Sequence, residues 1–131
     1  MIHSLTLRVY YEDTDLAGIV YYANYLKFIE RGRSEWVRTL GVDQARMKVE
    51  QGVVFAVRRL EADYLSPARF DDVLQVTTSV SRAGGARIDL DQAVLRDGQV
   101  LFVAKVTLVA LADSGTPVRL PATLREALSA G

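Results

Sequence analysis

Hydrophobic and polar residues alternate near the start of the chain and through most of its second half. In residues 4–10 the apolar side chains of Leu5, Leu7 and Val9 are separated by polar ones. A period of two residues is typical of a strand with one buried face. The same alternation predicts four further strands, at residues 53–65, 72–82, 87–96 and 100–112.

Short turns separate the last three of these strands. The Asp-Gly pair at 97–98 is a favourable two-residue hairpin turn, and Ala-Gly-Gly at 83–85 is expected to form another. Residues 100–112 are apolar on both faces apart from Lys105 and a threonine. We therefore expect this strand to be covered on both sides.

The segment after Tyr21 has a helical period instead. Apolar residues and one glycine recur at the spacing of a helix face, at Tyr25, Phe28, Ile29, Gly32, Trp36 and Leu40. Gly41 then provides a stop signal, so the pattern predicts a helix of about 19 residues and about 28 Å. Gly32 costs about 1 kcal/mol relative to alanine inside a helix, so we expect close packing against another backbone there. The opposite face is charged and is expected to meet solvent or a partner.

Two shorter helices complete the predicted elements. Asp43 is a suitable N-cap for a helix that ends near Gln51, and residues 121–128 are expected to form a final helical turn or two. Five strands and one dominant helix predict an α+β fold, in which a five-stranded antiparallel sheet wraps around one long central helix. Neither a linker nor a repeat interrupts the sequence, so residues 1–131 are expected to form a single domain.

The charge balance and two residue counts exclude several classes of function. Sixteen basic and sixteen acidic side chains cancel, which argues against nucleic acid as the main partner. The chain has no cysteine, which excludes disulfides, thiolate metal sites and a cysteine nucleophile. Its single histidine is His3, so a zinc site and a Ser-His-Asp triad are disfavoured, and we expect no metal.

Neither a secretion signal nor a transmembrane segment is expected from the sequence. A basic stretch followed by an apolar one is missing at the start, and no apolar run approaches the roughly 20 residues that cross a bilayer. Half of the residues are hydrophobic, which is enough to fill a core. We therefore expect a soluble, cytoplasmic protein.

Residues 10–25 contain the main candidates for chemistry. Asp15 and Gly18 precede the predicted helix, whose first N–H groups are unpaired and lie at the positive end of the helix dipole. A carboxylate here lies where an oxyanion could also be stabilised. Asp15 could equally be only a turn or capping residue, and Asn24 could orient water or favour the helix start. Asp13 is expected to be structural and to bond amides of its own loop.

The spacing of Asp13, Asp15 and Gly18 superficially matches a calcium-binding loop. Ala17 and Asn24, however, occupy positions that require an oxygen ligand and a bidentate glutamate. The loop is also apolar. We therefore reject calcium binding at this loop.

The same residues form a motif that resembles a known family. The motif is Tyr11-x-Asp13-x-Asp15-x-x-Gly18-x-Val20-x-x-x-x-Tyr25, followed by Glu30-x-x-Arg33-x-Glu35. With the Ser-Pro-Ala-Arg-Phe-Asp-Asp segment at 66–72, it resembles the 4-hydroxybenzoyl-CoA thioesterase-like hotdog family. The greatest resemblance is to the acyl-CoA thioesterases associated with the Tol–Pal cell-envelope system. The hotdog fold of this family, a sheet wrapped around a central helix, agrees with the elements expected from periodicity.

The resemblance implies an acyl-CoA thioesterase, which hydrolyses its substrate to a free acid and CoA. By this resemblance Asp15 is the catalytic carboxylate, acting either as nucleophile or as general base. The backbone N–H of Tyr22 polarises the thioester oxygen, and Gly18 allows the loop and the substrate to approach closely. At the position of Tyr22 members of the Tol–Pal group often carry histidine, whereas this chain has tyrosine, as in the hydroxybenzoyl-type enzymes.

The resemblance also implies how substrate and partner chains are bound. CoA is part of the substrate, so no separate cofactor is expected. Arginine suits the CoA phosphates. The candidate residues, each arginine of which could instead be a solvated surface charge, are Arg58, Arg59, Arg69, Arg82, Gly84 and Arg87. The protein is expected to be a homo-oligomer, a dimer or a tetramer, with sheets joined edge to edge and active sites at the dimer interface.

Three alternatives remain open from the sequence. A non-catalytic protein that binds acyl thioesters or acyl carrier protein would use the same pocket. A hotdog dehydratase acting on hydroxyacyl thioesters would need a paired histidine and acid, and His3 is poorly placed for this role. In a third alternative Glu30 or Glu35 on the long helix replaces Asp15, although pairing with nearby arginines is the expected role. The motif tyrosines could line an acyl pocket or simply pack the helix against the sheet.

Overall fold

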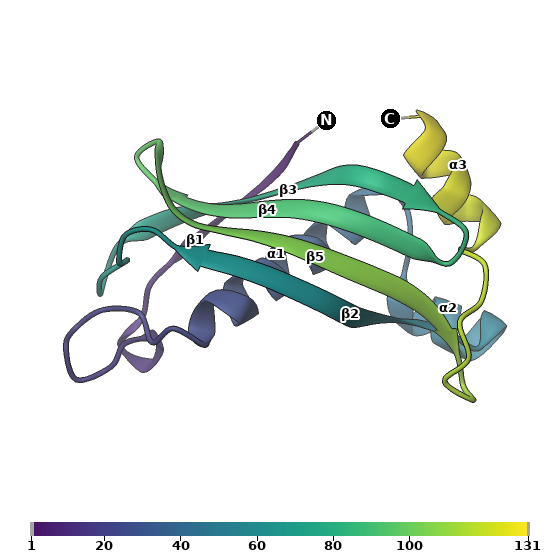
Figure 1. Cartoon of the computed structure of the whole chain (residues 1–131), viewed down its shortest axis with the longest axis horizontal. Coiled ribbons are helices and arrows are strands. Elements are labelled where there is room, and N and C mark those ends of the chain that lie inside the picture. Colours follow the sequence, from purple (N-terminus) through teal and green to yellow (C-terminus); the bar gives the residue numbers. More distant parts are fainter. Residues whose placement is uncertain (1, 131) are drawn as a thin grey trace.

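The five predicted strands form one antiparallel sheet in the order β1-β3-β4-β5-β2 (Figure 1). The computed structural model describes residues 2–130. Each strand bound lies within two residues of its predicted position, and the strands are β1 (His3–Arg8), β2 (Val53–Tyr64), β3 (Val73–Gly84), β4 (Arg87–Arg96) and β5 (Gln99–Ala112). The two edges of the sheet are therefore the short β1 and the long β2.

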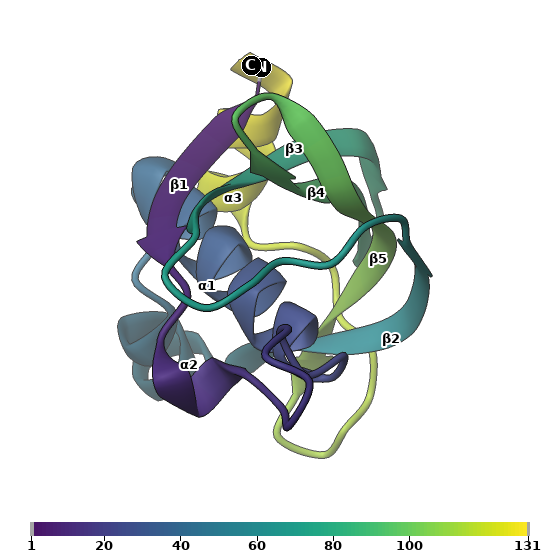
Figure 2. The ribbon, with the colours of Figure 1, turned by 90° about the vertical axis from the view of Figure 1, so that its left-hand side faces the viewer.

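The sheet curves around α1 (Asn24–Thr39), which packs against β1, β3 and β4 (Figure 2). This arrangement confirms the predicted α+β hotdog fold. The helix has 16 residues rather than about 19, because residues 21–23 form a turn before it. Two shorter helices, α2 (Gln44–Gln51) and α3 (Ala122–Ala130), lie where they were expected, and Asp43 caps α2 by accepting from Arg46 N–H.

The close approach at Gly32 of α1 is made to side chains. A Cβ atom at this position would lie 2.7 Å from Val76 Cγ1 of β3 and 3.4 Å from Gln92 Nε2 of β4. The prediction of close packing was therefore correct, but the expected backbone partner was wrong. Gln92 is fully buried and donates to Ile29 C=O and Thr78 Oγ1, both at 2.9 Å. The Gln92 amide group therefore has hydrogen-bond partners although it is buried between α1 and the sheet.

Only one face of β5 is buried in the single chain. Phe102, Val106 and Leu108 lie in the core, whereas Val103 is half-buried and Lys105 is exposed on the other face. The expectation of a strand covered on both sides is therefore wrong for the isolated chain. The charged face of α1 also points outward, as its sequence pattern predicted.

Residues 65–72, which connect β2 to β3, form hydrogen bonds with the chain after β1 and with the start of α1. Val9 N–H donates to Asp72 C=O at 2.8 Å, and Asp71 N–H donates back to Val9 C=O at 3.0 Å. Ala68 N–H donates to the buried Tyr25 hydroxyl of α1 at 2.9 Å. This connector therefore ties the chain after β1 and the start of α1 to one end of the sheet.

Asp72 is the most strongly held charge of the connector. Its Oδ2 accepts from Arg69 N–H at 2.8 Å and from Arg96 Nη1 of β4 at 2.7 Å. Burial raises the pKa of Asp72, but the Arg69 N–H and the Arg96 guanidinium outweigh it and hold this pKa below its ordinary value. Asp72 is therefore expected to be ionised in the folded protein at neutral pH.

Candidate active site

Asp15 begins the tight turn of a small hairpin that precedes α1. Asp15 N–H donates to Ile19 C=O at 2.9 Å, and Gly18 N–H donates to Asp15 C=O at 3.0 Å. Gly18 has φ +78°, the left-handed conformation that glycine adopts without strain in such a loop. Asp15 Oδ1 accepts from Ala17 N–H at 2.9 Å, and Oδ2 has no hydrogen-bond partner within residues 2–130. One oxygen of the exposed carboxylate is therefore fixed by a backbone N–H, and the other is available to a substrate or a water.

The hairpin is attached to the connector between β2 and β3. Val20 N–H donates to Ala68 C=O at 2.8 Å, and Ile19 pairs with Arg69 in an antiparallel bridge. The position of the Asp15 turn is thus set by the same segment that holds Tyr25 of α1. Space around Gly18 is open, because a Cβ atom there would meet nothing within 4 Å. Its conformation, rather than crowding within the chain, explains the glycine.

Asp13 joins the base of the hairpin to the start of α1. Its carbonyl oxygen accepts from Tyr21 N–H and from Asn24 Nδ2, both at 2.9 Å. Its buried side chain accepts from Tyr10 N–H at 2.8 Å through Oδ2, which confirms the predicted structural role. Asn24 therefore has a clear structural use at the start of α1. The alternative role for Asn24, orienting a water in the substrate site, stays a prediction.

The turn before α1 presents unpaired backbone donors. The N–H groups of Tyr22 and Ala23 donate to no acceptor within residues 2–130, whereas Asn24 N–H donates to Tyr21 C=O at 2.8 Å. Unpaired N–H groups at a helix start can stabilise a developing negative charge. The hairpin with Asp15 and the turn with Tyr22 meet at Asp13, so carboxylate and donor belong to one hydrogen-bonded unit.

Aromatic side chains surround the turn at Tyr22. Its ring lies 4.9 Å from the Tyr21 ring and 6.2 Å from that of Tyr64. Deeper in the protein, the buried Tyr25 ring stacks on the Phe102 ring with their centroids 5.0 Å apart. Burial raises the pKa of Tyr25, and the Ala68 N–H partly opposes this change. The inner rings pack helix against sheet, while the outer three are partly exposed beside the unpaired N–H of Tyr22.

Tyr64, at the end of β2, was not identified from the sequence. Its hydroxyl donates to Tyr22 C=O at 2.9 Å across a separation of 42 residues. An aromatic residue at the end of a strand is an ordinary core or surface residue in sequence. No local signal could have revealed this contact.

The candidate arginines are divided between the two ends of the sheet. Arg69 lies beside the Asp15 hairpin through its bridge with Ile19. Arg58, Arg59 and Arg87 line a hollow of about 380 Å³ on the sheet face opposite α1. A second hollow, of about 400 Å³, is lined by Arg82, Ala83, Gly84 and Arg87.

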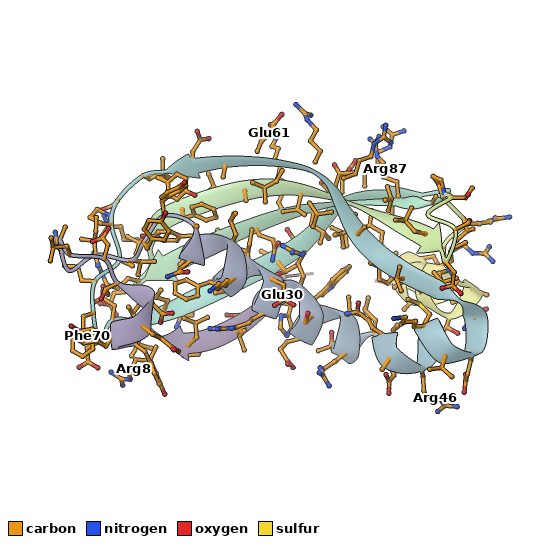
Figure 3. All side chains as sticks on the ribbon, turned by 90° about the horizontal axis from the view of Figure 1, so that it is seen from below. Arg8, Glu30, Arg46, Glu61, Phe70 and Arg87 are labelled. Carbon is orange, nitrogen blue, oxygen red and sulfur yellow. The ribbon has the colours of Figure 1, made fainter. Side chains whose placement is uncertain are left out.

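This arginine group lies far from the hairpin of its own chain. Figure 3 places Arg87 toward the end of the sheet opposite to Phe70, which belongs to the connector at the Asp15 end. Four of the candidate arginines thus line two hollows that share Arg87, away from Asp15 of the same chain. Their binding of CoA phosphates stays a prediction.

The alternative carboxylates lie away from the start of α1. Glu30 projects from the exposed face of α1, about two turns beyond its start, and binds Ser34 Oγ at 3.1 Å (Figure 3). Glu35 forms an ion pair with Arg38 at 3.5 Å. His3 opens β1 opposite Thr78, about five residues of strand before the end that meets the connector. None of the three shares a hydrogen-bonded unit with Tyr22.

Comparison with known proteins identifies the family. The model of the thioesterase-like superfamily matches residues 9–128. The chain belongs to this superfamily. An acyl-CoA thioesterase YbgC from Haemophilus influenzae is 43% identical over 127 residues, covering 95% of this chain and 92% of the relative. An acyl-CoA thioester hydrolase YbgC from Escherichia coli is 36% identical over 107 residues, covering 82% of this chain and 79% of the relative.

Solved structures of the superfamily have the same fold. A probable thioesterase from Bartonella henselae superposes with a TM-score of 0.88 at 38% identity, covering 92% of this chain and all of the other. A variant of 4-hydroxybenzoyl-CoA thioesterase in complex with 4-hydroxybenzoyl-CoA gives a TM-score of 0.90 at 22% identity, covering 96% of this chain and 97% of the other. The second likeness concerns the fold alone. The predicted membership of the hotdog thioesterases is confirmed.

The described residues contain neither a membrane-spanning helix nor a group of metal ligands. Among residues 2–130, no helix is both long and apolar enough to span a bilayer. The same residues contain no group of three or more histidine, cysteine or carboxylate side chains that could hold a metal ion. The absence of a cofactor stays a prediction.

Proposed function

We propose that this protein hydrolyses an acyl-CoA to a free acid and CoA at the Asp15 end of the sheet. The observation that carries this proposal is the single hydrogen-bonded unit in which Asp13 joins the Asp15 hairpin to the unpaired N–H of Tyr22. The names of the relatives from Haemophilus influenzae and Escherichia coli support the same substrate class. Asp15 and Tyr22 are the residues to which we assign the chemistry.

The reaction needs a carboxylate and an oxyanion donor. Asp15 either attacks the thioester carbonyl carbon, giving a mixed anhydride that water hydrolyses, or removes a proton from the attacking water. In both routes negative charge develops on the carbonyl oxygen and is stabilised by the Tyr22 N–H, a donor worth about 3–4 kcal/mol in comparable sites. The carbon–sulfur bond then breaks, and CoA leaves as a thiolate.

The exposed edge strand β2 supports a homodimer. It is 12 residues long and exposes apolar side chains, with Val57 at 47%, Leu60 at 36% and Tyr64 at 48% relative accessibility. Such an edge offers unpaired backbone groups to a second chain. Pairing of two β2 strands about a two-fold axis would give one continuous sheet of two chains. A tetramer of two such dimers fits the same proposal.

A two-fold axis through β2 would complete the site. It reverses the strand direction, so the Asp15 end of one chain would lie beside the arginine end of its partner. In this arrangement Arg58, Arg59, Arg82 and Arg87 of the second chain would meet the CoA phosphates, with Gly84 in their loop and Arg69 contributed by the first chain. The distance between the two ends within one chain supports this assignment (Figure 3).

The proposal also covers the location of the protein, its need for a cofactor and its partners. A cytoplasmic location and the absence of a separate cofactor fit a CoA-dependent hydrolase. A Tol–Pal connection is a further prediction. An acyl carrier protein could present the thioester in place of CoA, and a protein that only binds the thioester is the second candidate. The open Oδ2 of Asp15 favours the enzyme over the binding protein.

The test is thiol release from acetyl-CoA, butyryl-CoA, palmitoyl-CoA and benzoyl-CoA by the wild type and by Asp15→Asn. We expect the variant to lose about 10³-fold in kcat on the preferred substrate. Glu12→Gln, which changes an exposed carboxylate of the preceding 3-10 turn (Tyr11–Asp13), is the control and should keep full activity. Circular dichroism establishes that all three proteins fold. Equal turnover by folded wild type and Asp15→Asn would refute the role of Asp15, and binding without turnover would favour the binding protein.

A further inference from the structure

A side chain from the edge strand fixes the turn that carries the unpaired N–H groups. Tyr64, the last residue of β2, donates its hydroxyl to Tyr22 C=O at 2.9 Å. This bond joins two segments that the sequence separates by 42 residues. Within residues 2–130 it is the one side-chain hydrogen bond received by the backbone of the turn formed by residues 21–23.

The Tyr64 bond occupies an acceptor that a longer helix would use. In a regular α-helix the C=O of Tyr22 would accept from Leu26 N–H, four residues later. In this protein Leu26 N–H donates to Ala23 C=O at 3.2 Å instead. The Tyr64 hydroxyl therefore takes the place of a helical donor, and the peptide groups around Tyr22 remain outside α1. Their N–H groups lie before the first helical hydrogen bond and are unpaired, as at any helix start.

Packing fixes the position of the Tyr64 ring. Its centroid lies 5.0 Å from that of Phe102 and 5.4 Å from that of Tyr25, both in edge-to-face geometry and both rings buried. Partial burial, together with Tyr22 and Tyr25, raises the pKa of Tyr64. The hydroxyl is thus protonated at neutral pH and can donate. A rigid ring with a directed donor is suited to positioning a backbone group.

We propose that Tyr64 is a positioning residue for hydrolysis. Its hydroxyl holds the Tyr22–Ala23 peptide group, and this restrains the rotation about Tyr22 so that the adjoining Tyr22 N–H meets the thioester oxygen. The inference rests on the proposed function, because it needs the Tyr22 N–H as oxyanion donor. Tyr64 acts through the backbone of Tyr22 and makes no bond to the reacting atoms. Since an oxyanion donor works best in the transition state, losing its orientation should lower kcat more than it raises KM.

The first test compares Tyr64→Phe with Tyr21→Phe in the full-length protein. Both changes remove one hydroxyl from neighbouring, partly exposed rings, but the Tyr21 hydroxyl has no hydrogen bond within residues 2–130. We expect kcat of Tyr64→Phe to fall about tenfold with KM changed less than about twofold, and Tyr21→Phe to match the wild type. Unchanged kcat in Tyr64→Phe, or an increase in KM alone, would overturn the inference.

A spectroscopic readout separates positioning from a merely structural role. The probe is the acyl-CoA of the panel that turns over fastest, labelled with 13C at its thioester carbonyl and bound to Asp15→Asn. Infrared difference spectra should show the carbonyl stretch shifted to lower frequency on binding, because the Tyr22 N–H polarises it. Adding Tyr64→Phe should reduce this shift, and an equal shift in both proteins would refute the inference.

Failure of the wider proposal would look different. If the wild type hydrolyses none of the four acyl-CoA compounds, or if Asp15→Asn is as active as the wild type, the proposed function fails and the Tyr64 inference fails with it. If Asp15→Asn is inactive and Tyr64→Phe is fully active, the thioesterase stands and only the positioning role is wrong. Thermal unfolding of both tyrosine variants shows whether any loss of kcat comes from unfolding.

Discussion

The two ends of the sheet differ in how their polar groups are engaged. At the Asp15 end, the hairpin, the connector and the start of α1 share a continuous set of backbone and side-chain hydrogen bonds. At the arginine end, Arg59 pairs with Glu61 and Arg87 with Asp89, while the exposed Arg58 and Arg82 form no ion pair within residues 2–130. The polar groups of one end are bound within their own chain, and the other end leaves two of its four guanidinium groups unpaired.

This difference matches what the two halves of an acyl-CoA demand. A thioester carbonyl reacts only when nucleophile and oxyanion donor are held in a defined geometry. Phosphate groups can be bound by mobile guanidinium groups that adjust to them. Under the proposed function, the hydrogen-bonded Asp15 end would hold the reacting groups in place, and the arginine end would bind the phosphates. Variants that change one end at a time test this difference.

Beside the loss expected from Asp15→Asn, a change at the arginine end should act on substrate binding. In the double variant Arg82→Ser/Arg87→Ser we expect KM for acyl-CoA to rise about tenfold with kcat unchanged, because charge-assisted contacts to phosphate are lost. Initial rates over a range of substrate concentrations give both constants. Arg46→Ser, which removes an exposed ion pair with Glu50 on α2, is the matched control. A decrease in kcat without a change in KM would contradict the division of roles.

Mixed dimers test whether the two ends meet across chains. Asp15→Asn and Arg82→Ser/Arg87→Ser chains, co-expressed with different tags, can be purified as heterodimers. If each site combines Asp15 of one chain with the arginines of the other, one site of the heterodimer has Asp15 and all its arginines. The other site lacks Asp15 and both substituted arginines. At low substrate we expect about half of the wild-type kcat/KM, because a two-fold dimer pairs each Asp15 end with the partner's arginines.

The same heterodimer would behave differently if each chain formed its own site. One site would lack Asp15 and the other would lack two arginines. Its activity would then be the mean of the two parent homodimers, about one twentieth of the wild-type value given the tenfold effect expected above. Size-exclusion chromatography of the tagged material checks that the dimer is intact.

The smallest effect concerns the connector at the Asp15 end. Asp72→Asn should lower the free energy of unfolding by about 1–2 kcal/mol at pH 7, because it removes a charge bound to Arg96 and the Arg69 N–H. The folded pKa of Asp72 lies below its unfolded value of about 3.9, so the stabilisation is present above that value. It should disappear as the pH falls through the folded pKa. Urea unfolding of both proteins from pH 7 to pH 2 measures this convergence.

Asp71→Asn is the matched control for this experiment. The Asp71 side chain is mostly exposed, and its ion pair with Arg8 spans 3.1 Å between two solvated groups. Its φ of 72° lies in the left-handed region, which asparagine tolerates. We expect a change of less than about 0.5 kcal/mol. An equal loss in both variants would mean that the connector does not depend on the Asp72 charge in particular.

Periodicity predicted the strands well because burial on one face of a sheet is a local property of sequence. The start of α1 was less predictable. Tyr21 and Tyr22 continue the helical period, yet Tyr22 C=O is bound by Tyr64 and the helix begins at Asn24. The neighbour of Gly32 was also misjudged, because the side chain that it meets belongs to a distant strand.

The candidate site was predictable only where its residues are close in sequence. Asp15, Gly18 and Tyr22 lie within eight positions of one another, and a single motif contains them all. It was not predictable that Arg58 and Arg59 lie near Arg87, because this depends on β2 pairing with β5, which lies far along the sequence. Tyr64 belongs to the same class, since its contact depends on how the end of β2 meets α1.

The connector also determines when the Asp15 hairpin can close during synthesis. Ile19 and Val20 pair with Arg69 and Ala68, about fifty residues later in the chain. At 5–20 residues per second, a ribosome needs about 3–10 s to make this stretch. Over that interval the nascent chain carries the carboxylate without the partners that place it. The Asp15 hairpin is therefore expected to take its place only after the middle of the chain has left the ribosome.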